Sequence, residues 1–359
     1  MSACDTCLRR GTLLATLVPW IERALGERRR IPALLALDDD ELVEAVCRRK
    51  RGAIDAERER FDPAEARAEA AAAGLETVCR HEDGFPPRLL AGTDAVAALW
   101  LLGDARWLEA LTRERPVALV GARRASPYGI EVARGLGREL AVAGVPVVSG
   151  MARGIDSAAH EGALEAGGLT VAVLAGGADL ASPRSRRDLH RRIAASGLVV
   201  SELPPGTRPA RWSFPARNRI MAGLAAMTVV VEGTLSSGSL ITAGFAQDLG
   251  RDLGAVPGQV TSALGAGPND LIHAGAYVVR SAADMLDVLY GAGGGPVSEP
   301  PPLEPHLAAL LDAVERGEGS PDALAASASE AAGVLAGLSE LELLGLIRRS
   351  AGGHYVRCA

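Results

Sequence analysis

Residues 117–156 read VALVGARRASPYGIEVARGLGRELAVAGVPVVSGMARGID, and this stretch decides the fold. Its two apolar runs, Val117–Val120 and Val145–Ser149, are each followed by a glycine-containing turn. Between them, apolar side chains recur on one helical face over residues 130–143. This pattern predicts a strand, a helix and a second strand, with the strands parallel and covered on both faces.

The same alternation of apolar runs and amphipathic segments continues to about residue 290. The further predicted strands are Thr170–Ala175, Leu198–Glu202, Thr228–Glu232, Leu253–Val256 and Tyr277–Val279. The sequence therefore predicts an α/β domain, a doubly wound Rossmann-like parallel sheet, over residues 80–290. Such sheets bind ligands at the carboxyl ends of their strands, so the loops that follow the strands are the candidate sites.

The flanking regions differ in character from this domain. Residues 1–75 are rich in Arg, Glu and Ala and predict a small helical N-terminal domain. Residues 291–302 are rich in Gly and Pro and predict a linker. Residues 303–359 show three helical patterns and then a hairpin signal around Gly352-Gly353, which predicts a C-terminal winged-helix domain. Whether that domain contacts DNA or a protein stays open.

The charge of the chain is acidic overall but unevenly distributed. The 38 Lys+Arg and 44 Asp+Glu give a net charge of −6, which excludes a uniformly basic nucleic-acid coat. Residues 184–219, however, hold nine arginines and two acids, a local charge of about +7 that leaves the remainder near −13. Trp212 and Phe214 lie in the same stretch. Arginines interleaved with aromatics are typical of surfaces that bind single-stranded nucleic acid.

The sequence gives little indication of a membrane-spanning segment or of a metal site. No apolar run approaches the ~18–20 residues that span a bilayer, so we predict a cytoplasmic protein without a membrane partner. Five cysteines in a chain of this length do not indicate a disulfide scaffold. Cys4 and Cys7 form a CxxC pair, but no second CxxC or HxxxH pair accompanies it. We therefore predict no metal site and no cofactor.

The loops after the predicted strands carry groups that bind phosphate. Residues 121–126 read GARRAS, which is not GxGxxG but places a glycine, two arginines and a hydroxyl at a helix N-terminus. Residues 149–156 and 236–242 offer further glycines and hydroxyls. No acid–base pair or activated nucleophile emerges, so the loops predict binding and no catalytic residue.

Arg217 and Arg219 form a separate signal. They fall in the first turn of a helix predicted to begin near Pro215, where the helix dipole disfavours cations. A bound phosphate would reverse that effect. The alternative is that both arginines form internal ion pairs, with Glu202 or Glu232 as partners.

Six loop segments taken together resemble the DNA-processing protein DprA (Smf) family. They are Gly121–Gly129, Ser149–Asp156, Ser201–Gly206, Phe214–Ile220, Ser237–Ala243 and Ala255–Gly258. The resemblance covers residues 80–290 well, and residues 1–75 fit loosely the sterile-alpha-motif-like domain of many members. It implies a competence protein that binds and protects single-stranded DNA in natural transformation and recombination. It also implies loading of the recombinase RecA and a homodimer formed through the Rossmann-like domain.

The candidate DNA-binding residues come from the resemblance and from the loops. The resemblance places DNA contacts at Arg123, Gly150, Arg153, Arg184, Arg217, Asn218 and Arg219. The loop analysis adds Ser149, Phe214, Ser237 and Gly238. The chain departs from the family pattern at Ser182, Gly233 and Gly254, where members usually carry Tyr, Ala and Phe.

Two other functions remain open at this point. A nucleotide-processing hydrolase of the lysine-decarboxylase-like (LOG) type shares a related core, and Glu232-Gly233-Thr234 at a strand end supports it. The PGG that precedes the equivalent Gly-Thr in that family is absent from this chain. A winged-helix transcription factor is less favoured, because the positive charge concentrates in the middle domain rather than in the last one.

Overall fold

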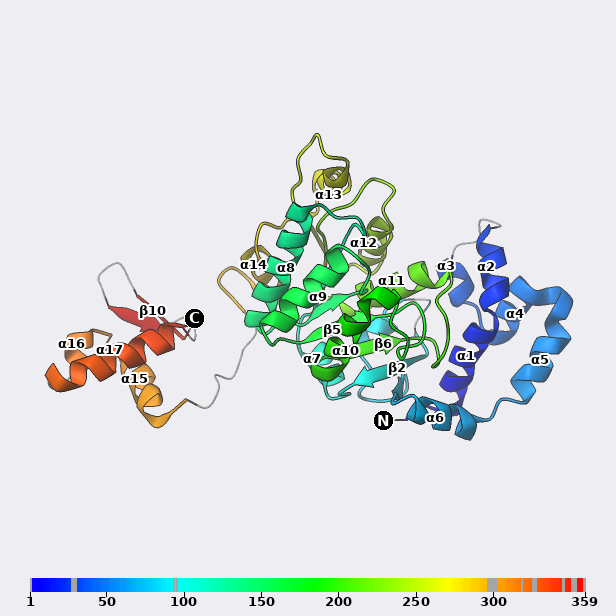
Figure 1. Ribbon diagram of the computed structural model, residues 1–359, viewed down its shortest axis with the longest axis horizontal. Coiled ribbons are helices and arrows are strands. Elements are labelled where there is room, and N and C mark those ends of the chain that lie inside the picture. The colour runs from blue at the N-terminus through cyan, green and yellow to red at the C-terminus, as the bar shows by residue number, and fades with distance from the viewer. Residues whose placement is uncertain are drawn as a thin grey trace. The chain divides into compact units, whose positions relative to one another are not determined.

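The computed structural model in Figure 1 describes residues 2–357, apart from residues 27–30, 93, 95, 296–302, 318, 325–327, 344–345 and 350–353. The chain forms two compact units, Met1–Pro296 and Val297–Ala359. Each unit is described separately below.

A nine-stranded sheet forms the centre of the first unit, in the order β1-β2-β6-β5-β4-β3-β7-β8-β9. The strands are β1 (Glu76–Cys79), β2 (Ala98–Gly103), β3 (Val117–Val120), β4 (Val147–Ser149), β5 (Thr170–Val173), β6 (Leu198–Ser201), β7 (Met227–Val230), β8 (Asp252–Ala255) and β9 (Tyr277–Val278). The strands from β6 to β9 pair in parallel, whereas β1 and β2 add to one edge as antiparallel strands. The predicted doubly wound α/β class is confirmed.

The two antiparallel strands were not predicted. β1 and β2 precede the strand–helix alternation, so the pattern that identifies the parallel strands does not extend to them. The predicted parallel strands are present, with ends that differ by up to two residues from the predicted ones.

Helices cover both faces of the sheet. On one face lie α7 (Trp107–Arg113), α11 (Ser213–Leu224) and α12 (Gly238–Asp248), which pack on Ala118 and Val120 among others. On the other face lie α8 (Pro127–Val142), α9 (Ile155–Glu165), α10 (Arg187–Ser196) and α14 (Ala282–Tyr290). Helices α8 and α9 run side by side (Figure 1). Successive residues of β3 therefore alternate between two cores, which is why that strand is apolar throughout.

The N-terminal region is helical, as predicted. Its helices are α1 (Asp5–Thr16), α2 (Val18–Gly26), α3 (Ile31–Leu35), α4 (Asp39–Cys47), α5 (Arg51–Glu59) and α6 (Pro63–Ala72). They share a core with the start of α11, because Trp212 is 1% exposed among Leu14, Ile21 and their neighbours. Trp212 therefore does not contribute to a surface that binds single-stranded nucleic acid, as its place in the arginine-rich stretch suggested: its ring fills the contact between the N-terminal helices and the sheet domain.

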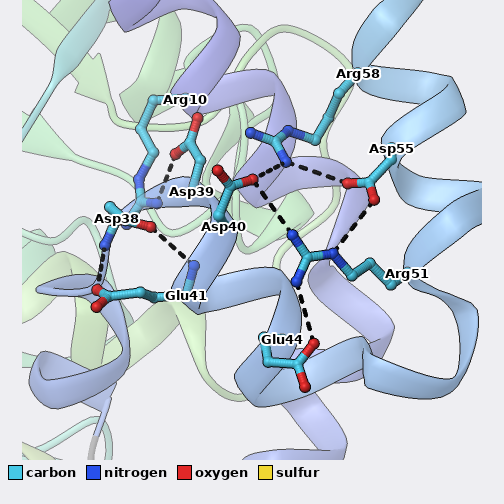
Figure 2. Close-up of polar contacts among 9 residues, drawn as sticks. All are labelled: Arg10, Asp38, Asp39, Asp40, Glu41, Glu44, Arg51, Asp55 and Arg58. Carbon is cyan, nitrogen blue, oxygen red and sulfur yellow. Dashed lines mark hydrogen bonds and ion pairs between the residues drawn. The ribbon is translucent and has the colours of Figure 1, made fainter.

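Charged side chains organise the outer helices of this region (Figure 2). Asp38 caps α4, accepting a hydrogen bond from the backbone N–H of Glu41, whose carboxylate accepts one from the Asp38 N–H. This capping box satisfies two amide groups that the first turn of the helix leaves unpaired. Arg58 lies between the carboxylates of Asp40 and Asp55, at 2.7 and 3.3 Å. The pair with Asp40 links α5 to α4, whereas the pair with Asp55 lies within α5.

The second unit contains α15 (Pro305–Glu315), α16 (Pro321–Leu324), α17 (Ala328–Leu343) and the antiparallel strands β10 (Ile347–Arg349) and β11 (Tyr355–Arg357). A small core of leucines, Ile347 and Tyr355 holds them together. This element order is the one expected of a winged helix, which stays a prediction here; the Gly352-Gly353 turn lies outside the described residues. Over the described part of the chain, no helix is both long and apolar enough to cross a bilayer.

Candidate nucleic-acid interface

A pocket of about 450 Å³ opens at the carboxyl ends of β3 and β7. The connections from these neighbouring strands run in opposite directions along the sheet, since β4 lies on one side of β3 and β8 beyond β7. Such a reversal leaves a crevice between the two loops, the usual ligand site of doubly wound sheets. Residues 121–124, Phe214 and Arg217 from α11, and the start of α12 line the pocket.

The guanidinium of Arg217 forms part of the pocket wall, although the residue is only 6% exposed. Its Nη1 donates to the backbone carbonyls of Gly150 and Val173, at 2.6 and 2.7 Å, and its Nε donates to Asn218 Oδ1 at 3.2 Å. Its Nη2 has no hydrogen-bond partner among the described residues. The Nε and Nη1 atoms are thus bonded to the protein, while Nη2 remains available to donate to a ligand in the pocket.

The electrostatics around Arg217 favour a bound anion. Burial lowers the pKa of Arg217 to about 10, the nearby carboxyl of Asp156 raises it and the cation of Arg123 lowers it further. The guanidinium therefore stays charged at neutral pH. Burial also raises the pKa of Asp156, which has no ion pair within 4.0 Å among the described residues. A phosphate would supply the second negative group that this site lacks.

Arg123 and Phe214 form the outer wall of the pocket. Arg123 is exposed, and its guanidinium carbon lies 5.0 Å from the centre of the Phe214 ring. This cation–π contact orients Arg123 toward the pocket that both residues line. Phe214 is half-buried, so part of its ring remains accessible for stacking. Arg124 is exposed and lines the same pocket.

The N-terminus of α12 also lines the pocket. Ser237 caps this helix and accepts a hydrogen bond from the backbone N–H of Ser239. Gly238 is exposed, and no atom lies within 4 Å of where a Cβ would be, so a ligand can approach the backbone closely. Asn218 donates to the Gly238 carbonyl at 3.2 Å and so links α12 to Arg217. Free amides at a helix start favour anions.

Three predicted contact residues are buried in the protein framework instead. Ser149 is fully buried, and its hydroxyl donates to the Leu119 carbonyl at 2.6 Å. Gly150 is buried as well; a side chain there would overlap the Arg217 guanidinium. Both residues position others rather than present a group to a ligand.

Arg219 is the third, and the ion-pair alternative describes it. Its Nη2 lies 2.6 and 2.5 Å from the two Glu202 carboxylate oxygens, and its Nε lies 3.4 Å from Asp94. The residue is 7% exposed and lines a different pocket. Arg217 and Arg219 lie two positions apart in α11, about 200° around the helix axis, so their side chains point in different directions.

The remaining predicted arginines lie on neighbouring loops. Arg153, after β4, and Arg184, in the 3₁₀ turn Arg184–Arg186, are exposed but do not line the pocket. The Arg184–Arg219 segment is not one basic patch, because several of its arginines have carboxylate partners: Arg186 with Glu161, Arg191 with Asp188, Arg211 with Glu22 and Arg219 with Glu202. The charge counted in the sequence exceeds the charge available to a ligand.

Glu232, which supported the hydrolase alternative, and the buried His160 both have structural partners. Glu232 is buried, and its carboxylate accepts from the backbone N–H and the hydroxyl of Ser126, at 2.8 and 2.6 Å. His160 is buried, its Nδ1 lies 2.6 Å from the Thr170 hydroxyl, and burial lowers its pKa to about 3. Both groups hold the loops in place and neither lines the pocket.

Sequence reasoning missed several pocket residues. Leu264, Thr234, Ile241 and Met221 line it without belonging to a phosphate-binding pattern. Leu264 comes from α13 (Ala263–His273), distant from the other lining residues in the chain.

Comparison with known proteins identifies the family of the chain. The family model described as DNA recombination-mediator protein A matches residues 76–290. A putative DNA processing protein DprA of Mycobacterium tuberculosis is 40% identical over 295 residues, covering 77% of this chain and 74% of that protein. The X-ray structure of DprA from Streptococcus pneumoniae superposes with a TM-score of 0.64 at 30% identity, covering 80% of this chain and 99% of the other.

A structure of DNA processing protein A from Helicobacter pylori, described for its single-stranded DNA binding mode, superposes with a TM-score of 0.54 at 29% identity. It covers 60% of this chain and 95% of the other. The family model matches more than half of the chain and the relatives match it over most of its length, so the chain belongs to the DNA recombination-mediator protein A (DprA) family.

Proposed function

We propose that the pocket at the carboxyl ends of β3 and β7 binds single-stranded DNA, and that the protein acts as a recombination mediator through this site. The observation that carries the proposal is Arg217, a buried guanidinium whose Nη2 has no hydrogen-bond partner among the described residues and lies beside a helix N-terminus. Membership of the family and the single-stranded DNA binding of the Helicobacter pylori relative support it.

The geometry suggests a division of labour within the site. Arg217 and the amides at the start of α12 converge on one phosphate, because both line the same pocket. Phe214 stacks on a base, and Arg123 bridges the ring and the next phosphate. Arg153 and Arg184 contact phosphates farther along the strand from exposed positions. Because this mode reads backbone and base faces, it predicts little sequence preference.

The test is a salt series of oligonucleotide binding. We expect affinity for a single strand to exceed affinity for a duplex and to fall with salt, with a slope of about −0.7 per phosphate neutralised. Arg123→Ala should flatten that slope, whereas Phe214→Leu should lower affinity at every salt concentration with little change of slope.

The matched control is Arg113→Ala. Arg113 ends α7, at the amino end of β3, and its side chain is 70% exposed, so the net charge changes equally while the site is untouched. Equal losses for Arg123→Ala and Arg113→Ala, or a flat salt response of the unaltered protein, would refute the proposed site.

We also propose that the protein is not an enzyme. The pocket contains one buried carboxyl, Asp156, and its other polar groups are arginines, an amide and hydroxyls suited to binding. Incubation with nucleoside monophosphates should release no free base. Release at enzyme-like turnover that disappears in Glu232→Gln would favour the hydrolase instead.

Loading of RecA and self-association as a homodimer are proposed from the family resemblance. Sedimentation of the full chain should show a concentration-dependent dimer. RecA filament formation on strands coated by single-strand-binding protein should be faster in its presence. The same acceleration with Arg123→Ala at equal DNA occupancy would separate RecA contact from DNA contact.

A further inference from the structure

The structure brings together a second ligand pair for the Cys4-Cys7 motif. Cys79, the last residue of β1, and His81 lie beside the start of α1. One ligand atom from each of the four residues falls within 4.8 Å of all the others. The prediction of no metal site depended on the lack of a CxxC or HxxxH partner, and this C-x-H pair, 72 residues downstream of Cys7, supplies one.

We infer that these four side chains form a structural zinc site, with three sulfur ligands and one nitrogen ligand. In tetrahedral zinc sites with Zn–S bonds of about 2.3 Å, neighbouring sulfur and nitrogen ligands lie about 3.5 Å apart. His81 Nδ1 lies 3.3 Å from Cys4 Sγ and 3.5 Å from Cys7 Sγ. Three cysteines with one histidine are an established zinc set, and its four positions leave none open for catalysis.

The surroundings fit a metal–thiolate cluster. The backbone N–H of Cys4 donates to Cys79 Sγ at 3.4 Å, a contact that stabilises a thiolate. Cys4 is the N-cap of α1, whose positive dipole end favours the net negative charge of zinc with three thiolates. The backbone N–H of Cys79 donates to Glu82 Oε1 at 3.2 Å, which fixes the turn that presents His81.

Contacts other than the ligands hold the two segments in register. The backbone N–H of Ala3 donates to the Thr77 hydroxyl, and Arg67 donates to the Ala3 carbonyl, at 3.1 and 2.8 Å. Zinc would therefore bind a preformed site and tie the first helix to the edge strand of the sheet. Binding would displace up to three thiol protons, with no change of oxidation state.

The test uses the full-length chain purified under reducing conditions. Metal is measured in the protein as purified, and the protein is then stripped of metal and reloaded with Co²⁺. We expect one equivalent of Zn²⁺ by elemental analysis, and Co²⁺ should give thiolate-to-metal charge transfer and the visible bands of a tetrahedral site. His81→Ala and Cys79→Ser should weaken Co²⁺ binding by about tenfold or more. Cys47→Ser is the control, because Cys47 is also buried but lies outside the cluster.

A thermal measurement keeps the test decisive if a ligand variant fails to fold. Chelation should lower the melting temperature of the unaltered chain, and Zn²⁺ should restore it. The inference is overturned if the reduced chain takes up neither metal, if chelation leaves melting unchanged, or if Cys47→Ser loses as much metal as Cys79→Ser. A Cys4–Cys7 disulfide that persists under reducing conditions, or the absorbance of an iron–sulfur cluster, would likewise overturn it.

Discussion

At the scale of single residues, Arg217 and Arg219 lie two positions apart in one helix and have different roles. Arg217 donates to two backbone carbonyls and faces the pocket, whereas Arg219 neutralises Glu202 and approaches Asp94. Both are buried, so both affect stability. The prediction that both arginines lie in the first turn of a helix beginning near Pro215 is wrong: α11 begins at Ser213, so Arg217 and Arg219 are its fifth and seventh residues, beyond the turn where the helix dipole acts.

Substitution should separate these tasks. Arg219→Met leaves the buried carboxylate of Glu202 and the partly buried carboxylate of Asp94 without their cation, and should lower the free energy of unfolding by about 3–5 kcal/mol. Arg217→Met leaves two carbonyls without a donor and should lower it by about 1–3 kcal/mol. Urea denaturation measures both values. At a temperature where each variant is folded, Arg217→Met should lose single-stranded DNA affinity and Arg219→Met should keep it; the reverse order would mean that the pocket has been misassigned.

At the scale of elements, β8 shows why a glycine stands at position 254 of this chain. A Cβ at this position would come 2.6 Å from Met227 Cε and 2.7 Å from Val279 Cγ2. The space that a side chain would need is already filled by β7 and by the residue after β9. Local packing thus accounts for the glycine at this position.

Gly254→Ala should therefore destabilise the protein by overpacking, by about 1–3 kcal/mol. Gly135→Ala is the matched control, because Gly135 lies inside α8 with no atom within 4 Å of its missing Cβ. That change should stabilise the protein by about 0.5–1 kcal/mol, since alanine favours the helix. Changes of the same sign in thermal melting would contradict the packing argument.

Helix α14 provides an acid-sensitive element. Hydrogen bonds from the Arg280 side chain, then from backbone amides, lower the pKa of Asp284 to about 2. The carboxylate also completes a capping box with Ser281. Because the folded pKa lies below the unfolded value of about 3.9, its stabilisation is present above that value and is lost as the pH falls toward 2.

Asp284→Asn should lower stability at neutral pH by about 0.5–2 kcal/mol, the range of a lost helix cap. The difference between the two proteins should shrink between about pH 4 and about pH 2, where the unaltered carboxylate becomes protonated. Denaturation at a series of pH values checks this. A difference independent of pH over that window would assign the effect to packing rather than to charge.

At the scale of the whole molecule, the pocket lies entirely within Met1–Pro296. The second unit has its own hydrophobic core and its own antiparallel strand pair, β10 and β11. A chain ending after Gly295 should therefore fold, keep the melting behaviour of the sheet domain and retain most of its single-stranded DNA affinity. Unfolding of that chain, or loss of most of its binding, would show that the last unit is integral to the site.

The sequence by itself determined the parallel sheet and the family, and it predicted phosphate-binding groups in the loops that follow the strands. Each of these depends on local pattern: apolar runs such as Val117–Val120, loop strings such as Ser149–Asp156, and capping residues such as Ser237. Local spacing controls strand burial and helix capping directly, so these features can be predicted without the fold.

Tertiary structure alone decided which side chains meet. It buried Trp212 beneath the N-terminal helices, paired Arg219 with Glu202 and left Arg217 facing the pocket. It also placed Cys79 and His81 beside Cys4 and Cys7. These outcomes depend on contacts between residues that are distant in the chain. The partner that each side chain meets is decided by the packing of whole helices and strands. Local spacing does not encode that partner, because nearby positions of one helix point to different partners.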